Sequence, residues 1–151
     1  MATWRQFEEE AADLAAEVRA RFEAHETHVL ATLRKDGSPR VSGSEVAFVG
    51  DELTFGSMLG AVKALDLRRD GRCAVHAHPG EGDAKIAGVA VEAVDPAEKQ
   101  ALTTGKEPPG DFHAFRLDLR EAVFTSVDQE EQLLVIRLWR PGRPVEVIRR
   151  R

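Results

Sequence analysis

The sequence predicts a mainly β protein, an antiparallel barrel with flanking helices, on three observations. Beyond residue 26, most of the chain places apolar residues at every second position, which is the period of a strand with two different faces. Short turn sequences separate these segments, so that neighbours can pair as antiparallel hairpins. One crossing helix interrupts about eight strands, whereas a parallel sheet needs a helix between each pair.

The amino-terminal segment is predicted to be a helix that packs on the barrel. Its apolar residues form a single stripe at helical spacing, made of Trp4, Phe7, Ala11, Leu14, Val18 and Phe22. Thr3 with Gln6 three positions later fits a capping box, which marks the start of a helix. We therefore expect one domain over residues 1–151, with the helix in residues 1–26 and the barrel in residues 27–151.

The strand period begins directly after this helix. Residues 27–34, 39–49 and 52–57 are predicted to be three strands of a meander, because Asp36-Gly37 and Gly50-Asp51 supply turns between them. A helix is expected at about residues 61–70. A further strand pair is expected at residues 72–78 and 84–94, joined by the loop PGEGD.

The last third opens with a short helix. Asp95 is the expected N-cap, Pro96 the first helical residue and Glu98 the capping-box acid, and Gly105 ends the helix. The loop GKEPPGD then leads into strands predicted at residues 112–127, 131–140 and 144–150.

Composition excludes several classes of protein. The net charge of −5 argues against a nucleic-acid binder, which needs clustered Lys and Arg. No apolar run approaches the roughly 20 residues that span a bilayer, and MATWRQFEEE does not resemble a secretory signal.

The single cysteine, Cys73, has no intramolecular partner, so a reducing cytoplasm is the expected location. Its strand-like neighbours favour a buried small residue over a redox thiol.

Signatures of hydrolases, nucleotide triphosphatases and paired-cysteine metal sites are missing. His76 and His78 would lie on one face of a strand, roughly 7 Å apart. A metal there would need further ligands, and only Glu81 and Asp83 are near in sequence. The other interpretations are polar surface and a substrate contact, for which His78 is the candidate; we predict no metal site.

The strand, bend and helix around Lys63 are the most informative stretch. Gly56, Ser57 and Gly60 form the bend, and Lys63 falls in the first helical turn, where the helix dipole disfavours a cation. Free N–H groups, a hydroxyl and an ammonium together suit one phosphate group. From these residues alone, a phosphate site and a solvated lysine are equally compatible with the sequence.

The order of these segments resembles the pyridoxamine 5'-phosphate oxidase-like family of FMN-binding split β-barrels. The resemblance lies in ATLRKDGSPRVSGSEVAFVGDELTFGS, in VKALDLRRDGRCAVH and in AKIAGVAVEAV, and it covers about residues 27–94. It implies a split barrel that forms a homodimer. It also implies FMN, or a deazaflavin coenzyme in a related branch, in two clefts between the subunits.

The resemblance also assigns residues to the cofactor. Lys63 matches the lysine that binds the phosphate, and Ser57 matches a hydroxyl at the end of the preceding strand. Arg40 matches an arginine that reaches the phosphate. The strand that runs beside the flavin ring matches Arg40 to Val46. Within it the expected cofactor-binding residues are Arg40, Val41, Ser42, Gly43 and Ser44, where Gly43 suits close approach. Separately from the resemblance, Trp139 in the last hairpin is a candidate to close over the ring, although a core or dimer-interface position is the favoured interpretation.

Two positions depart from the family pattern. Val62 stands where an arginine usually precedes the lysine, and Glu45 stands where the strand often has lysine. Both changes weaken the case for FMN, because one removes a phosphate contact and the other disfavours an anionic reduced flavin. The expected function is hydride transfer to or from a small molecule by a flavin- or deazaflavin-dependent oxidoreductase. The alternative is a non-catalytic barrel that binds flavin or haem, with haem the less favoured ligand.

Overall fold

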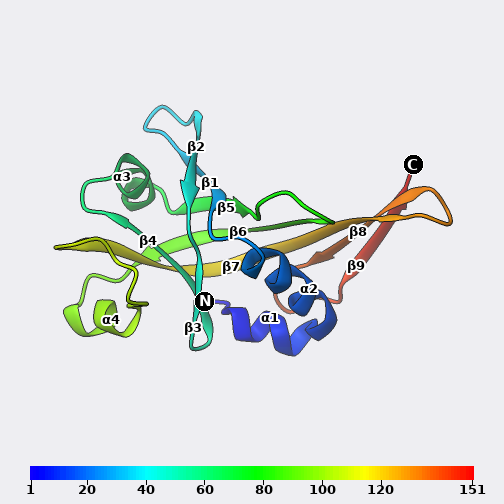
Figure 1. Cartoon of the computed structure of the whole chain (residues 1–151), viewed down its shortest axis with the longest axis horizontal. Helices are drawn as coiled ribbons and strands as arrows, with labels where there is room; N and C mark the ends of the chain where they lie inside the picture. Colours follow the sequence, from blue (N-terminus) through cyan, green and yellow to red (C-terminus); the bar gives the residue numbers. More distant parts are fainter.

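The computed structural model describes residues 1–151. Its nine strands form one sheet in which every neighbouring pair is antiparallel, as predicted. The main path runs β2-β1-β5-β6-β7-β4-β3, and β8 and β9 extend from β7 as an arm that carries the carboxyl terminus (Figure 1). The strands are β1 His28–Leu33, β2 Pro39–Ser44, β3 Ala47–Val49, β4 Glu52–Met58, β5 Arg72–His76, β6 Asp83–Glu92, β7 Phe112–Asp128, β8 Leu133–Trp139 and β9 Glu146–Arg150.

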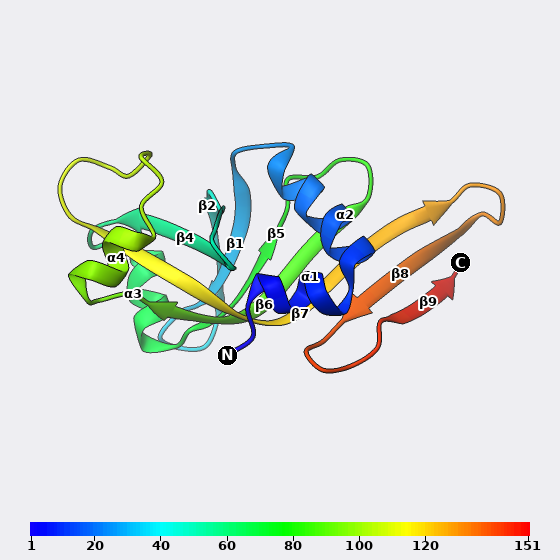
Figure 2. The same ribbon diagram turned by 90° about the horizontal axis from the view of Figure 1, so that it is seen from below.

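Four helices flank this sheet, so the predicted fold class is confirmed. They are α1 Trp4–Glu10, α2 Ala12–Glu23, α3 Val62–Arg69 and α4 Pro96–Ala101. Figure 2 shows α1 and α2 lying across β6 and β7, with α3 and α4 toward the end of the molecule opposite the arm. The expected cap of α4 is present, because the Asp95 side chain accepts a hydrogen bond from the Ala97 N–H. No helix has both the length and the apolar character needed to cross a membrane.

The predicted amino-terminal helix is interrupted at Ala11, which joins α1 to α2 with φ −150° and ψ 62°. The whole apolar stripe is nevertheless buried. The break brings Glu10 to the start of the turn after β8, where its Oε1 accepts hydrogen bonds from the Gly142 N–H at 2.7 Å and the Trp139 Nε1–H at 3.3 Å. Neither Gly nor Pro marks the break, so residue spacing alone predicts one helix.

The predicted three-stranded meander is wrong. The run over residues 39–49 divides at Glu45 into β2, which pairs with β1, and β3, which pairs with β4. Its two halves therefore hydrogen-bond to strands at opposite ends of the main path. The alternating pattern continues across the division, so it could not reveal that the pairing partner changes.

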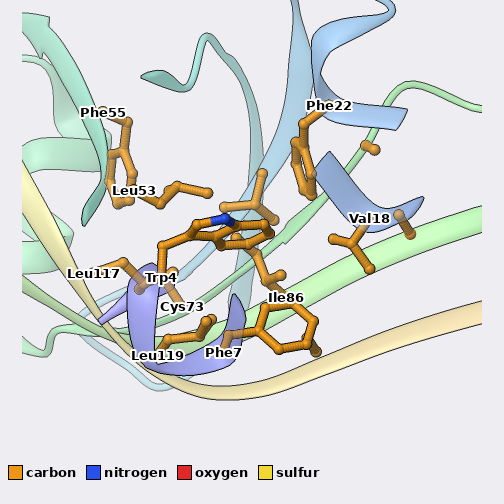
Figure 3. Close-up of a cluster of buried hydrophobic side chains, with 14 of the residues drawn as sticks. Trp4, Phe7, Val18, Phe22, Leu53, Phe55, Cys73, Ile86, Leu117 and Leu119 are labelled. Carbon is orange, nitrogen blue, oxygen red and sulfur yellow. The ribbon is translucent and has the colours of Figure 1, made fainter. Parts of the chain in front are cut away.

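The core lies between α1–α2 and the sheet, and Figure 3 shows side chains from both layers meeting there. Phe7 stacks on Trp139 with ring centroids 4.6 Å apart. Cys73 is part of this core, and burial raises the pKa of its thiol to about 12. The burial of Cys73 confirms the prediction of a buried small residue, and the raised pKa disfavours the reactive thiolate form.

Candidate functional site

A cleft of about 860 Å³ lies at the end of the molecule opposite the arm, a volume typical of a small-molecule site. Its walls come from the α2–β1 loop, the β2–β3 segment, β4, the start of α3 and the α4–β7 loop. The lining includes Thr27, Gly43, Ser44, Glu45, Val46, Ala47, Thr54, Phe55, Gly56, Ser57, Met58, Lys63, Leu102, Phe112 and Ala114. The cleft is therefore built around the strand, bend and helix that the sequence singles out.

Lys63 is half-buried in this cleft, beside Ser57. Its Nζ donates one hydrogen bond, to the Gly43 carbonyl at 2.8 Å, and no carboxylate lies within ion-pair distance. Burial lowers the pKa of Lys63 below its usual value. A lysine ammonium has three donors, so two remain for a ligand.

The start of α3 has the chemistry of an anion site as well. The helix begins after Ala61 with no side-chain cap and no acidic residue in its first turn, which leaves the initial N–H groups without side-chain acceptors. The Ser57 hydroxyl makes only a long contact of 3.5 Å with the Met58 carbonyl. The Lys63 ammonium and the Ser57 hydroxyl both line the cleft, and Lys63 stands in the first turn of this uncapped helix, so each of these features favours a phosphate group.

The β2 strand contributes only its end to the cleft. Gly43 and Ser44 line it, together with Glu45. Val41 is 71% exposed and Ser42 is half-buried, and neither belongs to the lining. Of the β2 residues expected beside the flavin ring, the structure thus brings Gly43 and Ser44 to Lys63.

Arg40 does not reach this cleft, in contrast to the expected phosphate contact. Its Nε donates to Asp66 Oδ2 at 2.7 Å, and it borders a shallow groove on another face of α3. Asp66 is 2% exposed and also accepts hydrogen bonds from Thr32 and Arg69. Val62 borders the same groove, so it also faces away from Lys63. The buried Asp66 carboxylate accounts for the position of Arg40, because it needs cationic partners.

Comparison with known proteins identifies the family. Residues 14–126 match the family model described as pyridoxamine 5'-phosphate oxidase. The chain belongs to this family. No curated protein sequence matches the chain significantly.

Solved structures share this family's fold at low sequence identity. A pyridoxamine 5'-phosphate oxidase-related, FMN binding protein from Nostoc punctiforme is 14% identical, with a TM-score of 0.67 over 100% of this chain and 98% of that one. PhzG from Burkholderia lata 383, in complex with tetrahydrophenazine-1-carboxylic acid, is 18% identical, with a TM-score of 0.64 over 93% and 89%. A heme binding protein from Mycobacterium smegmatis is 19% identical, with a TM-score of 0.60 over 90% and 57%.

Trp139 lies away from the cleft, in the hydrophobic core. It is fully buried, stacks on Phe7 and bonds to Glu10, and it does not line the cleft. The proposal that it closes over a cofactor ring is therefore wrong. The core position, which was the favoured interpretation, is the observed one, because a large aromatic ring at the end of β8 packs against Phe7 of α1.

His78 lies near the cleft but outside its lining. Its ring lies 4.0 Å, centroid to centroid, from that of His25, which does line the cleft. Its backbone N–H donates to Nδ1 of the buried His28 at 2.9 Å. His76 is turned toward the Ala77 carbonyl instead, 2.6 Å from its Nδ1. No group of three or more metal-ligating side chains gathers in the structure.

Two features of the site have no signal in the sequence. The loop after α4 closes one side of the cleft with Thr104, Lys106, Glu107 and Pro108, and Lys106 reaches across to Glu26 at 3.5 Å. Beneath the bend before α3, the buried His113 bonds to both Glu92 and Gly60. These partners are far apart in the sequence and meet only through strand pairing.

Proposed function

We propose that this member of the pyridoxamine 5'-phosphate oxidase family is a flavin-dependent oxidoreductase that transfers a hydride to or from a small molecule. FMN is the proposed cofactor, with a deazaflavin coenzyme as the alternative. The observation that supports this function is Lys63, a half-buried ammonium in a ligand-sized cleft with two free donors and no carboxylate partner. The FMN-binding relative from Nostoc punctiforme shares the fold over the whole chain.

The residues of the cleft fit a phosphorylated flavin. Lys63, the Ser57 hydroxyl and the start of α3 would hold the phosphate, and a phosphate there would offset the desolvation of the lysine. The main chain at Gly43 and Ser44, on the cleft wall, would lie against the ring. The bound flavin would supply the hydride chemistry, while the chain anchors, orients and shields it.

The charge of the cleft limits how tightly an anionic cofactor binds. Glu23, Glu26, Glu45 and Glu107 line it, against Lys63 and Lys106. Glu45 has no cationic partner within ion-pair distance. An unpaired carboxylate near the ring disfavours the anionic reduced flavin, which is the reason to keep the deazaflavin coenzyme as the alternative cofactor.

A homodimer is part of this proposal. Exposed apolar side chains surround the bend and α3, namely Met58 (68% exposed), Leu59 (60%), Val62 (53%) and Leu65 (45%). Exposed apolar side chains of this kind are typical of a protein interface, and Met58 lines the cleft, so a second copy bound at Met58 would also cover the cleft. The buried Cys73 is compatible with the cytoplasm as the proposed location.

The experiment is to identify and measure the cofactor. The purified protein is denatured and any released small molecule is identified by mass spectrometry. FMN affinity is then measured by fluorescence titration for the wild type, for Lys63→Ala and for the control Lys85→Ala, whose side chain is exposed on β6.

We expect Lys63→Ala to weaken FMN binding by about 10- to 100-fold, the value of a charge-assisted hydrogen bond, and Lys85→Ala to leave it unchanged. Equal dissociation constants for Lys63→Ala and the wild type would contradict the assigned phosphate site. Release of haem would favour the non-catalytic alternative. No binding of any flavin, even when added, would refute the proposed function.

A further inference from the structure

The bend between β4 and α3 depends on a side chain from another strand. Gly60 has φ +78°, and the Ala61 N–H donates to the Met58 carbonyl at 3.1 Å, which closes the turn. The Gly60 N–H points away from this turn and donates to Nε2 of His113 at 3.1 Å. His113 is 1% exposed, so water cannot readily replace this acceptor.

The two contacts of His113 determine its tautomer. Because Nε2 accepts from Gly60, the ring proton must be on Nδ1, which donates to Glu92 Oε2 at 2.9 Å. The Glu92 carboxylate is held in turn by Arg68, whose Nε and Nη2 donate to its two oxygens at 2.5 and 3.0 Å. The hydrogen bond from Arg68 lowers the pKa of Glu92, so this acceptor remains charged.

This chain of contacts fixes both ends of α3 to the sheet. Arg68, in the last turn of α3, is bonded to β6 through Glu92, and Gly60, just before its first turn, is bonded to β7 through His113. Lys63 lies between these two points. In addition, Ser57 is the direct partner of His113 in the β4–β7 register. His113 is therefore the strand partner of Ser57 and supports the bend three residues before Lys63.

We propose that His113, as a neutral imidazole protonated on Nδ1, is a positioning residue that holds the Gly60 bend and so aims Lys63 and Ser57 at the cofactor phosphate. This inference rests on the proposed function for the phosphate. Its structural part, the support of the bend, stands on the contacts alone. His113 does not line the cleft and touches no part of the proposed ligand site.

Two substitutions separate the contacts of His113. Gln can place its amide oxygen near the position of Nε2 and continue to accept from Gly60, whereas Asn reaches only the position of Nδ1 and can still donate to Glu92. The probes are FMN and riboflavin, which lacks the phosphate. The ratio of the riboflavin to the FMN dissociation constant isolates the contribution of the phosphate.

We expect His113→Asn to reduce this ratio by about five-fold or more, the equivalent of one net hydrogen bond, through weaker FMN binding with unchanged riboflavin binding. His113→Gln should keep the ratio within about two-fold of the wild type. A merely structural role would weaken both flavins alike. An unchanged ratio in a folded His113→Asn variant would overturn the proposal.

Hydrogen exchange at the Gly60 amide, followed by NMR without ligand, tests the support of the bend independently. Slow exchange in the wild type and in His113→Gln, with fast exchange in His113→Asn, supports it even if no flavin binds and the proposed function fails. Fast exchange in the wild type overturns it. If His113→Asn does not fold, Glu92→Gln replaces it, because one amide oxygen cannot serve both Arg68 and His113. In that variant, a reduced ratio of the riboflavin to the FMN dissociation constant supports the proposal, and an unchanged ratio overturns it.

Discussion

Asp66 attaches α3 to β1 and β2 through Thr32 and Arg40, and replacing it by asparagine tests this attachment. The Asp66 carboxylate accepts hydrogen bonds from Arg40 Nε at 2.7 Å, from the Thr32 hydroxyl at 2.8 Å and from Arg69 Nη2 at 2.8 Å. It is 98% buried, whereas the Arg40 and Arg69 side chains are 26% and 37% exposed. Asparagine has the shape of aspartate, but it carries no charge, and its NH₂ group would face one of these three donors.

The magnitude follows from these contacts. Hydrogen bonds to a charged group contribute about 1 kcal/mol more than neutral ones, and a buried donor left without an acceptor costs about 1–3 kcal/mol. Two arginines lose the charge and one donor loses its acceptor, which gives about 3–5 kcal/mol. The exposure of Arg69 allows water to replace part of its loss. We therefore expect Asp66→Asn to lower the free energy of unfolding by about 3 kcal/mol at pH 7.

The stabilisation that Asp66 provides decreases as the pH falls. Burial raises the pKa of Asp66, but the hydrogen bonds from Arg40, Thr32 and Arg69 outweigh it and leave the pKa below the ordinary value of 3.8. The stabilisation is therefore complete above about pH 4 and is lost as the pH falls through the lower folded value. The difference between wild type and variant should be full at pH 7 and should shrink below pH 4.

Urea unfolding followed by tryptophan fluorescence measures this difference, because Trp4 and Trp139 are both buried in the folded protein. The control is Asp51→Asn, which removes an exposed pair with Arg5 at 3.4 Å and should cost less than about 1 kcal/mol. If Asp66→Asn cost no more than Asp51→Asn, the buried cluster would not be what holds α3, and the explanation for the position of Arg40 would be refuted.

Two further predictions concern the core and the assembly. Trp139→Phe should lower the free energy of unfolding by about 1–3 kcal/mol, through lost packing and the lost bond to Glu10, and leave FMN affinity within two-fold; a large loss of FMN affinity in a stable variant would restore Trp139 to the cofactor site. Light scattering should give about twice the chain mass of 16.6 kDa, and a mass of one chain would contradict the proposed homodimer.

Local signals in the sequence predicted most of the secondary structure. Capping residues such as Thr3 and Asp95 act within their own turn, and the strand period reports which face is buried, so these elements were predicted near their observed positions. The break at Ala11 and the division of the strand run at Glu45 were missed. Both depend on which distant element a segment packs against, and a one-dimensional pattern does not contain that information.

In the candidate site, too, local features were predicted and contacts between distant segments were missed. The bend and helix start around Lys63 and Ser57 were found as local features, their phosphate role came from the family resemblance, and both residues do line the cleft. Arg40 was assigned to the phosphate because it matches the family pattern. The buried Asp66 on α3 instead binds its guanidinium outside the cleft. His113 was missed because its partners Glu92 and Gly60 reach it through β6 and the end of β4.

The two polar clusters that involve α3 explain why few cations are free to bind a ligand at the proposed phosphate site. Asp66 occupies Arg40, and Glu92 occupies Arg68, so these cations hold the helix to the sheet and are not free for a ligand. Lys106 also lines the cleft but pairs with Glu26, so Lys63 is the lining lysine without a carboxylate partner, in a cleft that four glutamates line. A single ammonium supplies less binding energy than the arginine and lysine pair of the family pattern. We therefore expect a bound flavin to exchange with solution more readily than a cofactor held by two or three cations, and the proposed phosphate site to depend on the supported bend that positions Lys63.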